Sequence, residues 1–199
     1  MLRGNDLLFS QAFRPSSRRV GRLPRLVNSL ASRKPGSPID TGGGGGVGIQ
    51  GVQLATAMGL RSIVVDTGDE RAQLAKHHGA EVFLDFQKEE DTAGKVVELT
   101  EGGAHGVFVT AVQAYPTALG YLGLRAGAKV MWCVLRAVSG RGILTRSSIG
   151  LPPAGKFHID LDPSQLVFRN QSIQGTLVSS AQEIDETLDF AKRGTTWTV

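Results

Sequence analysis

The chain has 199 residues, of which 41% are hydrophobic and 20% are charged, a composition ordinary for a globular domain. Its single cysteine, Cys133, excludes a disulfide framework and a zinc site built from several thiolates. No apolar run reaches the length of a membrane-spanning helix, so we predict no association with a membrane.

The net charge of +4 is unevenly distributed along the chain. Residues 1–40 hold eight basic and two acidic residues, a net +6, whereas residues 41–199 hold 14 basic and 16 acidic residues, a net −2. The positive charge therefore belongs to the N-terminal segment, and we predict no nucleic-acid partner for the rest of the chain.

Residues 1–40 are rich in Arg and Ser, poor in acidic residues and interrupted by four prolines. Three interpretations remain open: a mitochondrial transit peptide, a disordered basic arm, or a segment that is not native coding sequence. The segment has no apolar core of a secretory signal, so we expect a cytoplasmic protein, with the mitochondrion as the alternative.

A run of glycines at residues 42–46 opens the remainder of the chain. The spacing Gly43-x-Gly45-x-x-Gly48 fits a dinucleotide-binding turn, in which glycines permit a tight turn, close approach of a pyrophosphate and close packing of the following helix. Asp66 follows Gly43 by 23 residues and ends a β-branched stretch, where such turns have a ribose-binding acid. A flexible glycine linker is the alternative interpretation of the glycines alone.

The segments after the glycines alternate between helical and strand patterns. We predict a helix over 47–58, a strand over 62–66, a helix near 69–78, a strand over 81–86, a helix through 96–99, a strand over 106–110, a helix around 114–123, and strands over 129–134 and 172–178. Ser180 and Glu183 form a capping-box pattern that opens a last helix, which Gly194 ends. This alternation predicts an α/β domain over 41–194, with a Rossmann-type parallel sheet covered by helices on both faces.

Several stretches carry a resemblance to a known family. They are GGGGGVGIQGVQLATAMGL, SIVVDTGDERAQLAKHHGAEVFLDF, LTEGGAHGVFVTA, the LPP at 151–153, and IQGTLVSS followed by ETLDFAKRG. Over about 42–134 and 151–194 the chain resembles the nucleotide-binding domain of zinc-type, medium-chain alcohol dehydrogenases, in particular the fungal and yeast-like branch. In that family this domain binds NAD(H), and a separate GroES-like domain holds the catalytic zinc.

The resemblance implies a set of cofactor-binding residues. The pyrophosphate turn would be Gly43, Gly45, Gly46, Val47 and Gly48, and Asp66 would accept hydrogen bonds from the adenosine ribose and disfavour NADP. Arg71 matches a basic residue near that ribose, although an ordinary solvated charge explains it as well. Positions near the adenine or the nicotinamide are Thr110, Val134, Thr176 and Val178, for which core packing is an equal alternative.

The chain departs from the family pattern in four places. The zinc-binding domain is missing, so we predict no catalytic residue and no metal ligand, and we interpret His77, His78, His105 and His158 as helix-end, loop or surface residues. Two prolines, at 35 and 38, make a central strand before the glycine turn improbable. Residues 135–149 form a basic insert, and residues 195–199 form a tail in place of the family's last strands. These features suggest a gene-model or splicing artefact.

The resemblance predicts an NAD(H)-binding fragment of an alcohol dehydrogenase, an oxidoreductase type that passes hydride between an alcohol and NAD. We expect the fragment to be inactive alone, because the zinc that polarises the substrate is missing. The alternatives are a non-enzymatic nucleotide-binding or oligomerisation module, with subunit contacts through Ser172–Ser179, a zinc-free quinone-reductase-like reductase, and a methyltransferase. The substrate is not readable from the sequence.

Overall fold

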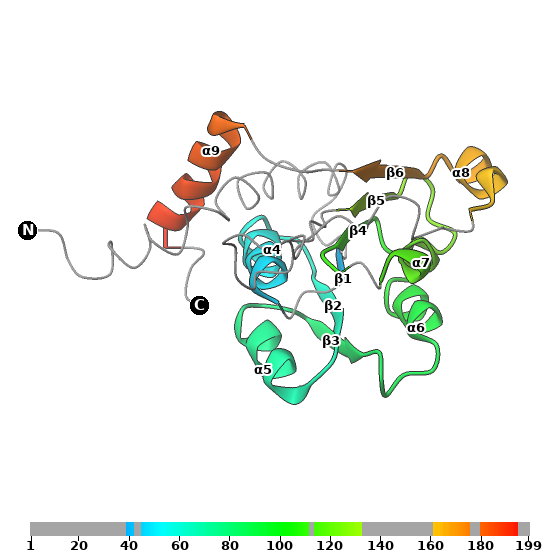
Figure 1. Cartoon of the computed structure of the whole chain (residues 1–199), viewed down its shortest axis with the longest axis horizontal. Helices are drawn as coiled ribbons and strands as arrows, with labels where there is room; N and C mark the ends of the chain where they lie inside the picture. The colour runs from blue at the N-terminus through cyan, green and yellow to red at the C-terminus, as the bar shows by residue number, and fades with distance from the viewer. Residues whose placement is uncertain (1–38, 42–44, 112–113, 133–160, 176–179, 195–199) are drawn as a thin grey trace, which may run out of the picture.

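The computed structural model of this chain describes residues 39–41, 45–111, 114–132, 161–175 and 180–194. The strands are β1 (Ile39–Thr41), β2 (Ile63–Asp66), β3 (Val82–Asp85), β4 (Gly106–Val109), β5 (Lys129–Trp132) and β6 (Ser172–Gly175). The helices are α4 (Gly46–Ala57), α5 (Asp69–His77), α6 (Thr92–Leu99), α7 (Tyr115–Ala118), the 3₁₀ helix η2 (Gly120–Leu122), α8 (Pro163–Arg169) and α9 (Ala181–Lys192). Strands and helices alternate along most of the described chain, as the hydrophobic pattern predicts (Figure 1).

All strand pairs are parallel. One ladder has the order β1-β4-β5-β6 and the other joins β2 to β3. β1 also lies against β2, which places the strands in the order β3-β2-β1-β4-β5-β6 (Figure 1). The strand order reverses between β1 and β4, and ligands of open α/β sheets bind outside the carboxyl ends of the strands at such a point.

The segment before the glycine turn corrects one expectation. We expected the prolines at 35 and 38 to prevent a central strand, yet Ile39–Thr41 pairs with β4. The strand is only three residues long, begins directly after Pro38, and has an irregular register against β4. Proline cannot donate a ladder hydrogen bond, and the described pairing begins at Ile39, the residue after Pro38. Within the described residues, the central strand is therefore present but short.

Helices cover both faces of the sheet, which the side chains of β2 show directly. Val64 is fully buried in a cluster with α4 and α5, whereas its neighbours Ile63 and Val65 are buried in a second cluster with α6, β4, α7 and β5. Successive strand residues point to opposite faces, so the consecutive apolar residues of β2 require a cover on each side. Figure 1 shows α4 and α5 on one side of the strands and α6 and α7 on the other.

Two helical segments differ from the prediction. The helix expected around 114–123 is divided into α7 and η2, because Gly120 and Gly123 disfavour a continuous helix. The helix α8 was not predicted, although Asp162 caps it by accepting a hydrogen bond from Ser164 N at 2.9 Å and Pro163 occupies its first position. The capping box of α9 is confirmed: Ser180 N donates to Glu183 Oε2 at 2.7 Å, and Glu183 N donates to Ser180 Oγ.

Among the described residues, no helix combines the length and the apolar character that a bilayer crossing requires. The predicted strand residues at 133–134 and 176–178, the insert at 135–149 and the segments 1–38 and 195–199 lie outside the described residues.

Candidate functional site

In the sequence, the glycine run lies between β1 and the N-terminus of α4. Gly45 is the N-cap of this helix, in extended conformation, and its carbonyl accepts the first helical hydrogen bond, from Ile49 N at 2.9 Å. No side chain caps this end of the helix and no acidic residue lies in its first turn, within the part of the chain described. The leading N–H groups and the positive end of the helix dipole are therefore available to an anion.

Two glycines at this end leave room above the helix. A Cβ atom added to Gly45 or Gly46 would meet no atom within 4 Å, so both backbones border open space. Farther along α4, Gly51 brings the helix against the ring of Phe108 on β4, with 3.7 Å between that ring and the position of a Cβ. This distance is an ordinary van der Waals contact, so helix and strand pack closely at Gly51, a contact that no motif in the sequence indicated.

Asp66 ends β2 with its side chain 10% exposed. Its Oδ1 accepts a hydrogen bond from Thr67 N at 2.8 Å and another from Arg71 Nη1 at 2.7 Å. Arg71 comes from α5 and its side chain is half exposed. The carboxylate is thereby held at the carboxyl end of the sheet, where it faces the same space as the glycine turn.

A second carboxylate lies beside Asp66 in the sheet, because Asp66 and Asp85 are register partners at the ends of β2 and β3. The pKa of Asp85 is lowered, first by the hydrogen bond from Gln87 N and further by Thr67, by Gly68 N and by the charge of Lys88. Asp85 therefore stays ionised and ties together the loops that follow both strands.

One cavity of about 590 Å³ connects these features. Its wall includes seven of the predicted cofactor-binding residues: Gly45, Gly46, Val47, Gly48, Asp66, Arg71 and Thr110. The volume is in the range of small-molecule sites. The other predicted residues, Gly43, Val134, Thr176 and Val178, lie outside the described residues. The cavity therefore contains the predicted residues at the N-terminus of α4 and those around Asp66.

Other residues, which no sequence motif indicated, also line the cavity. These residues are Val65, Thr67, Phe86, Glu89, Glu90, Thr92, Ala111, Ala114, Thr117 and Tyr121. Most of them follow β3 and β4, and the carboxyl ends of parallel strands meet at one edge of a sheet. That rule could have indicated the residues after β3, but the contribution of Tyr121 depends on how η2 packs.

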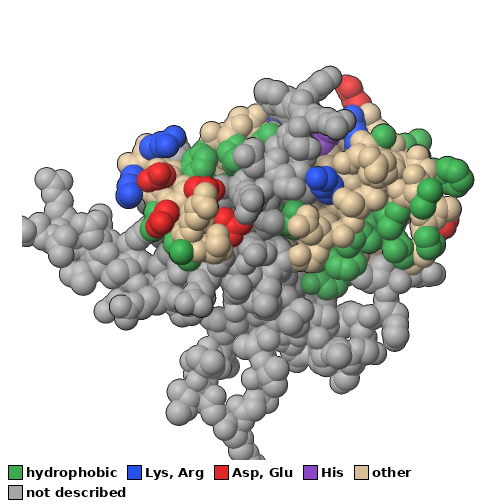
Figure 2. Space-filling view, turned by 90° about the horizontal axis from the view of Figure 1, so that it is seen from above, with side chains coloured by type: hydrophobic (Ala, Val, Ile, Leu, Met, Phe, Trp, Pro, Cys, Tyr) green, Lys and Arg blue, Asp and Glu red, His purple; other side chains and the backbone are tan. Residues whose placement is uncertain are grey.

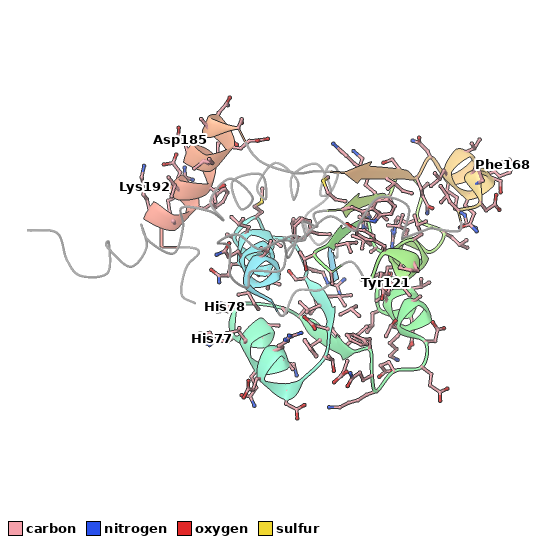
Figure 3. All side chains as sticks on the ribbon, viewed as in Figure 1. His77, His78, Tyr121, Phe168, Asp185 and Lys192 are labelled. Carbon is pink, nitrogen blue, oxygen red and sulfur yellow. The ribbon has the colours of Figure 1, made fainter. Side chains whose placement is uncertain are left out.

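The histidines within the described residues lie at the predicted kinds of position. His77 ends α5 and His78 caps it, with ring centroids 5.1 Å apart (Figure 3). Partial burial, followed by the charge of His77, lowers the pKa of His78. His105 immediately precedes β4, and His158 lies outside the described residues. In the described part of the chain, no three His, Cys, Asp or Glu side chains are grouped so that they could hold a metal ion.

Comparison with known proteins agrees with this architecture. The sequence profile of the family described as "Zinc-binding dehydrogenase" matches residues 46–193. The chain is 41% identical over 155 residues to an alcohol dehydrogenase of Schizosaccharomyces pombe, and 34% identical over 154 residues to alcohol dehydrogenase 1 of Caenorhabditis elegans. Each alignment covers 77% of this chain but only 39% of the relative, so the chain spans well under half the length of these proteins.

Solved structures show the same fold. The alcohol dehydrogenase of the archaeon Aeropyrum pernix superposes with a TM-score of 0.71 at 22% identity, over 92% of this chain and 48% of the other. The benzyl alcohol dehydrogenase of Acinetobacter calcoaceticus superposes with a TM-score of 0.69 at 20% identity, over 89% of this chain and 45% of the other. With the family profile, these matches confirm the predicted fold class, and the chain belongs to the zinc-binding, medium-chain alcohol dehydrogenase family, of which it contains the NAD-binding, Rossmann-like domain.

Proposed function

We propose that this chain binds NAD(H) in the 590 Å³ cavity, as the nucleotide-binding part of an alcohol dehydrogenase-type oxidoreductase. The observation that carries the proposal is that the N-terminus of α4 and the carboxylate of Asp66 border one cavity, although 20 residues separate Gly46 from Asp66. A dinucleotide needs both groups at once, an anion site for its pyrophosphate and an acceptor for its ribose hydroxyls.

Each group has a defined part in binding. The free N–H groups at the start of α4 would hold the pyrophosphate, and the open space above Gly45 and Gly46 lets it approach the backbone. Asp66 would accept hydrogen bonds from the ribose hydroxyls, held in orientation by Thr67 N and Arg71.

Electrostatics favours NAD(H) over NADP(H). Asp66, Glu89 and Glu90 line the cavity, and its one lining cation, among the residues described, is Arg71, which is already paired with Asp66. A 2′-phosphate placed near Asp66 would therefore meet repulsion from carboxylates, with no unpaired guanidinium in the described wall to offset it.

The cofactor supplies the hydride chemistry, and in zinc-type dehydrogenases a metal polarises the substrate oxygen. The described residues contain no set of ligands for such a metal. We propose that the chain binds cofactor but does not oxidise alcohols by itself.

A calorimetric titration of the purified chain with NADH and NADPH tests this function. Saturable NADH binding that is at least tenfold tighter than NADPH binding is the expected result. Absence of NADH binding by a cooperatively melting protein would overturn the proposal.

We also propose that a second copy of the chain covers one end of the molecule. β6 is the outer strand of its described ladder and carries no charged residue to guard its edge. Beside it in the sequence, Val167 and Phe168 of α8 are 76% and 87% exposed, and hydrophobic side chains gather at this end of the molecule (Figure 2). Two copies related by a two-fold axis would bury the same edge and the same apolar side chains on each other.

Light scattering measures the mass in solution and tests this contact. We expect a dimer, and we expect Phe168→Asp to give a monomer, whereas the control Leu74→Asp on the exposed side of α5 should remain dimeric. A monomeric unmodified chain at micromolar concentration would contradict the proposal.

A further inference from the structure

Three hydroxyl groups form a chain along one wall of the cavity. Thr92 is the first residue of α6, Tyr121 lies in η2 and Thr117 lies in α7. The Tyr121 hydroxyl is 3.4 Å from Thr92 Oγ1 and 3.3 Å from Thr117 Oγ1. Tyr121 is 3% exposed, and it lies where α6 and α7 cover the sheet (Figure 3). All three residues line the cavity.

Each hydroxyl has one proton, and this fixes the donor and the acceptor in each of the hydrogen bonds between the three hydroxyl groups. Thr117 Oγ1 donates its only proton to the carbonyl of Ala114 at 3.1 Å, so it can only accept from Tyr121. Tyr121 donates its only proton to Thr117, so its bond with Thr92 requires Thr92 to be the donor. Thr92 Oγ1 then has no proton left for a ligand, but it keeps a lone pair that can accept one.

The position of Thr92 relative to the other binding groups suggests which part of a bound dinucleotide it contacts. If the pyrophosphate lies at the turn of α4 and the ribose lies at Asp66, the base attached to that ribose reaches the remaining walls of the same cavity. These walls are the residues after β3 and the hydroxyl-bearing helices α6, α7 and η2. Phe86, about half exposed, adds an aromatic face on which a base can stack.

We propose that Thr92, oriented by Tyr121 and Thr117, makes the cavity selective for an adenine base, by accepting a hydrogen bond from the amino group at C6. Hypoxanthine carries a carbonyl oxygen at C6, which would face the Thr92 oxygen lone pair to lone pair. Donation by Thr92 to that carbonyl requires breaking its bond to Tyr121. The inference rests on the proposed dinucleotide site and adds a determinant of base identity to it.

The expected discrimination is modest. A neutral hydrogen bond has a net value of about 0.5–1.5 kcal/mol, which corresponds to about threefold to tenfold in affinity. We therefore expect the chain to bind NADH about threefold to tenfold more tightly than reduced nicotinamide hypoxanthine dinucleotide, which differs from NADH only at the base.

Calorimetric titration of both dinucleotides against three variants tests the assignment. Thr92→Val keeps the shape of the side chain but removes the acceptor, so the ratio of the two affinities should fall to about one. Thr117→Val removes the group that takes the Tyr121 proton. Tyr121 can then donate to Thr92, Thr92 can donate to a C6 carbonyl, and the ratio should fall below that of the unmodified chain.

Thr56→Val is the matched control, because Thr56 lies at the other end of α4 and its hydroxyl bonds to the carbonyls of residues 78 and 79. Its ratio should equal that of the unmodified chain, and thermal melting of each variant verifies folding. Equal binding of both dinucleotides by the unmodified chain, or an unchanged ratio in folded Thr92→Val, would overturn the base assignment while the dinucleotide site stands. Failure to bind either dinucleotide would overturn the site, and the assignment with it.

Discussion

Arg71 Nη1 donates a hydrogen bond to Asp66 Oδ1 at 2.7 Å and so joins the first turn of α5 to the end of β2. The Arg71 side chain is 53% exposed, so this ion pair adds little to folding stability, about 0–1 kcal/mol. The ion pair instead orients the Asp66 carboxylate, together with the hydrogen bond that Thr67 N donates to the same oxygen. The carboxylate is thus held by the loop after β2 and by α5 before any ligand binds.

Asp66→Asn tests the role of this carboxylate. The amide keeps the size of the side chain but removes the charge, which weakens the hydrogen bonds to ribose hydroxyls and the repulsion of a 2′-phosphate. We expect the ratio of NADPH to NADH dissociation constants to fall about tenfold in calorimetric titration. Asp69→Asn is the control, because it makes the same change on an exposed face of α5 outside the cavity wall. An equal fall in both variants would contradict a local role for Asp66.

Glu89 and Glu90 border the cavity from the loop after β3, and their charges oppose a second phosphate. The double variant Glu89→Gln/Glu90→Gln should bind NADPH about threefold more tightly at low ionic strength, with no change at 1 M salt, where screening acts within about 3 Å. The double variant Glu70→Gln/Glu98→Gln changes the net charge equally at exposed positions outside the wall. If the two double variants behave alike, the effect is one of net charge and not of the cavity.

Gly103 connects α6 to β4 at a point where a side chain has no room. Its φ is +122°, and a Cβ would overlap the carbonyl of Leu122. Its neighbour Gly102 has a similar φ of +114°, but a Cβ there would meet no atom within 4 Å. Alanine at 102 therefore introduces backbone strain alone, whereas alanine at 103 introduces strain and steric overlap. We expect Gly102→Ala to cost about 1 kcal/mol and Gly103→Ala at least about 2 kcal/mol more, measured by urea unfolding. Equal costs would show that strain alone accounts for both positions.

Arg61 and Glu81 form a two-point ion pair, with Nε to Oε2 and Nη2 to Oε1 both at 2.6 Å. This hydrogen bonding lowers the pKa of Glu81 below its usual value near 4.5. A carboxyl with a depressed folded-state pKa stabilises the fold above its unfolded pKa, and the contribution is lost as the pH falls through the folded value. Since both side chains are nearly half exposed, the contribution is at most about 1 kcal/mol.

The variant Glu81→Gln should therefore lose up to about 1 kcal/mol of unfolding free energy at pH 7 and show no difference from the unmodified chain at pH 2.5. Urea unfolding at the two pH values measures this. A difference that persists at pH 2.5 would mean that packing, and not the ion pair, explains the loss.

Local signals in the sequence accounted for most of the elements. The strand at 63–66 is apolar at its first three residues, and the alternation of such strands with helices predicts a parallel sheet with two covered faces. The capping box at Ser180 and Glu183 is a contact between residues three apart, so it too is visible in the sequence. β1 and α8 were missed for different reasons. β1 is held by pairing with a strand 67 residues later, from Ile39 to Gly106, whereas α8 begins at a local signal, Asp162–Pro163.

The sequence by itself determined the order and kind of most elements, the glycine turn and the acid at the end of the next strand, because these depend on residue spacing within one βαβ unit. Only the tertiary structure decided which residues complete the cavity. Thr92, Thr117 and Tyr121 come from three helical segments, and nothing in their spacing brings them to the space bordered by Gly45 and Asp66. That meeting depends on parallel strands delivering their carboxyl ends to one edge, and on the packing of α6, α7 and η2 over one face of the sheet.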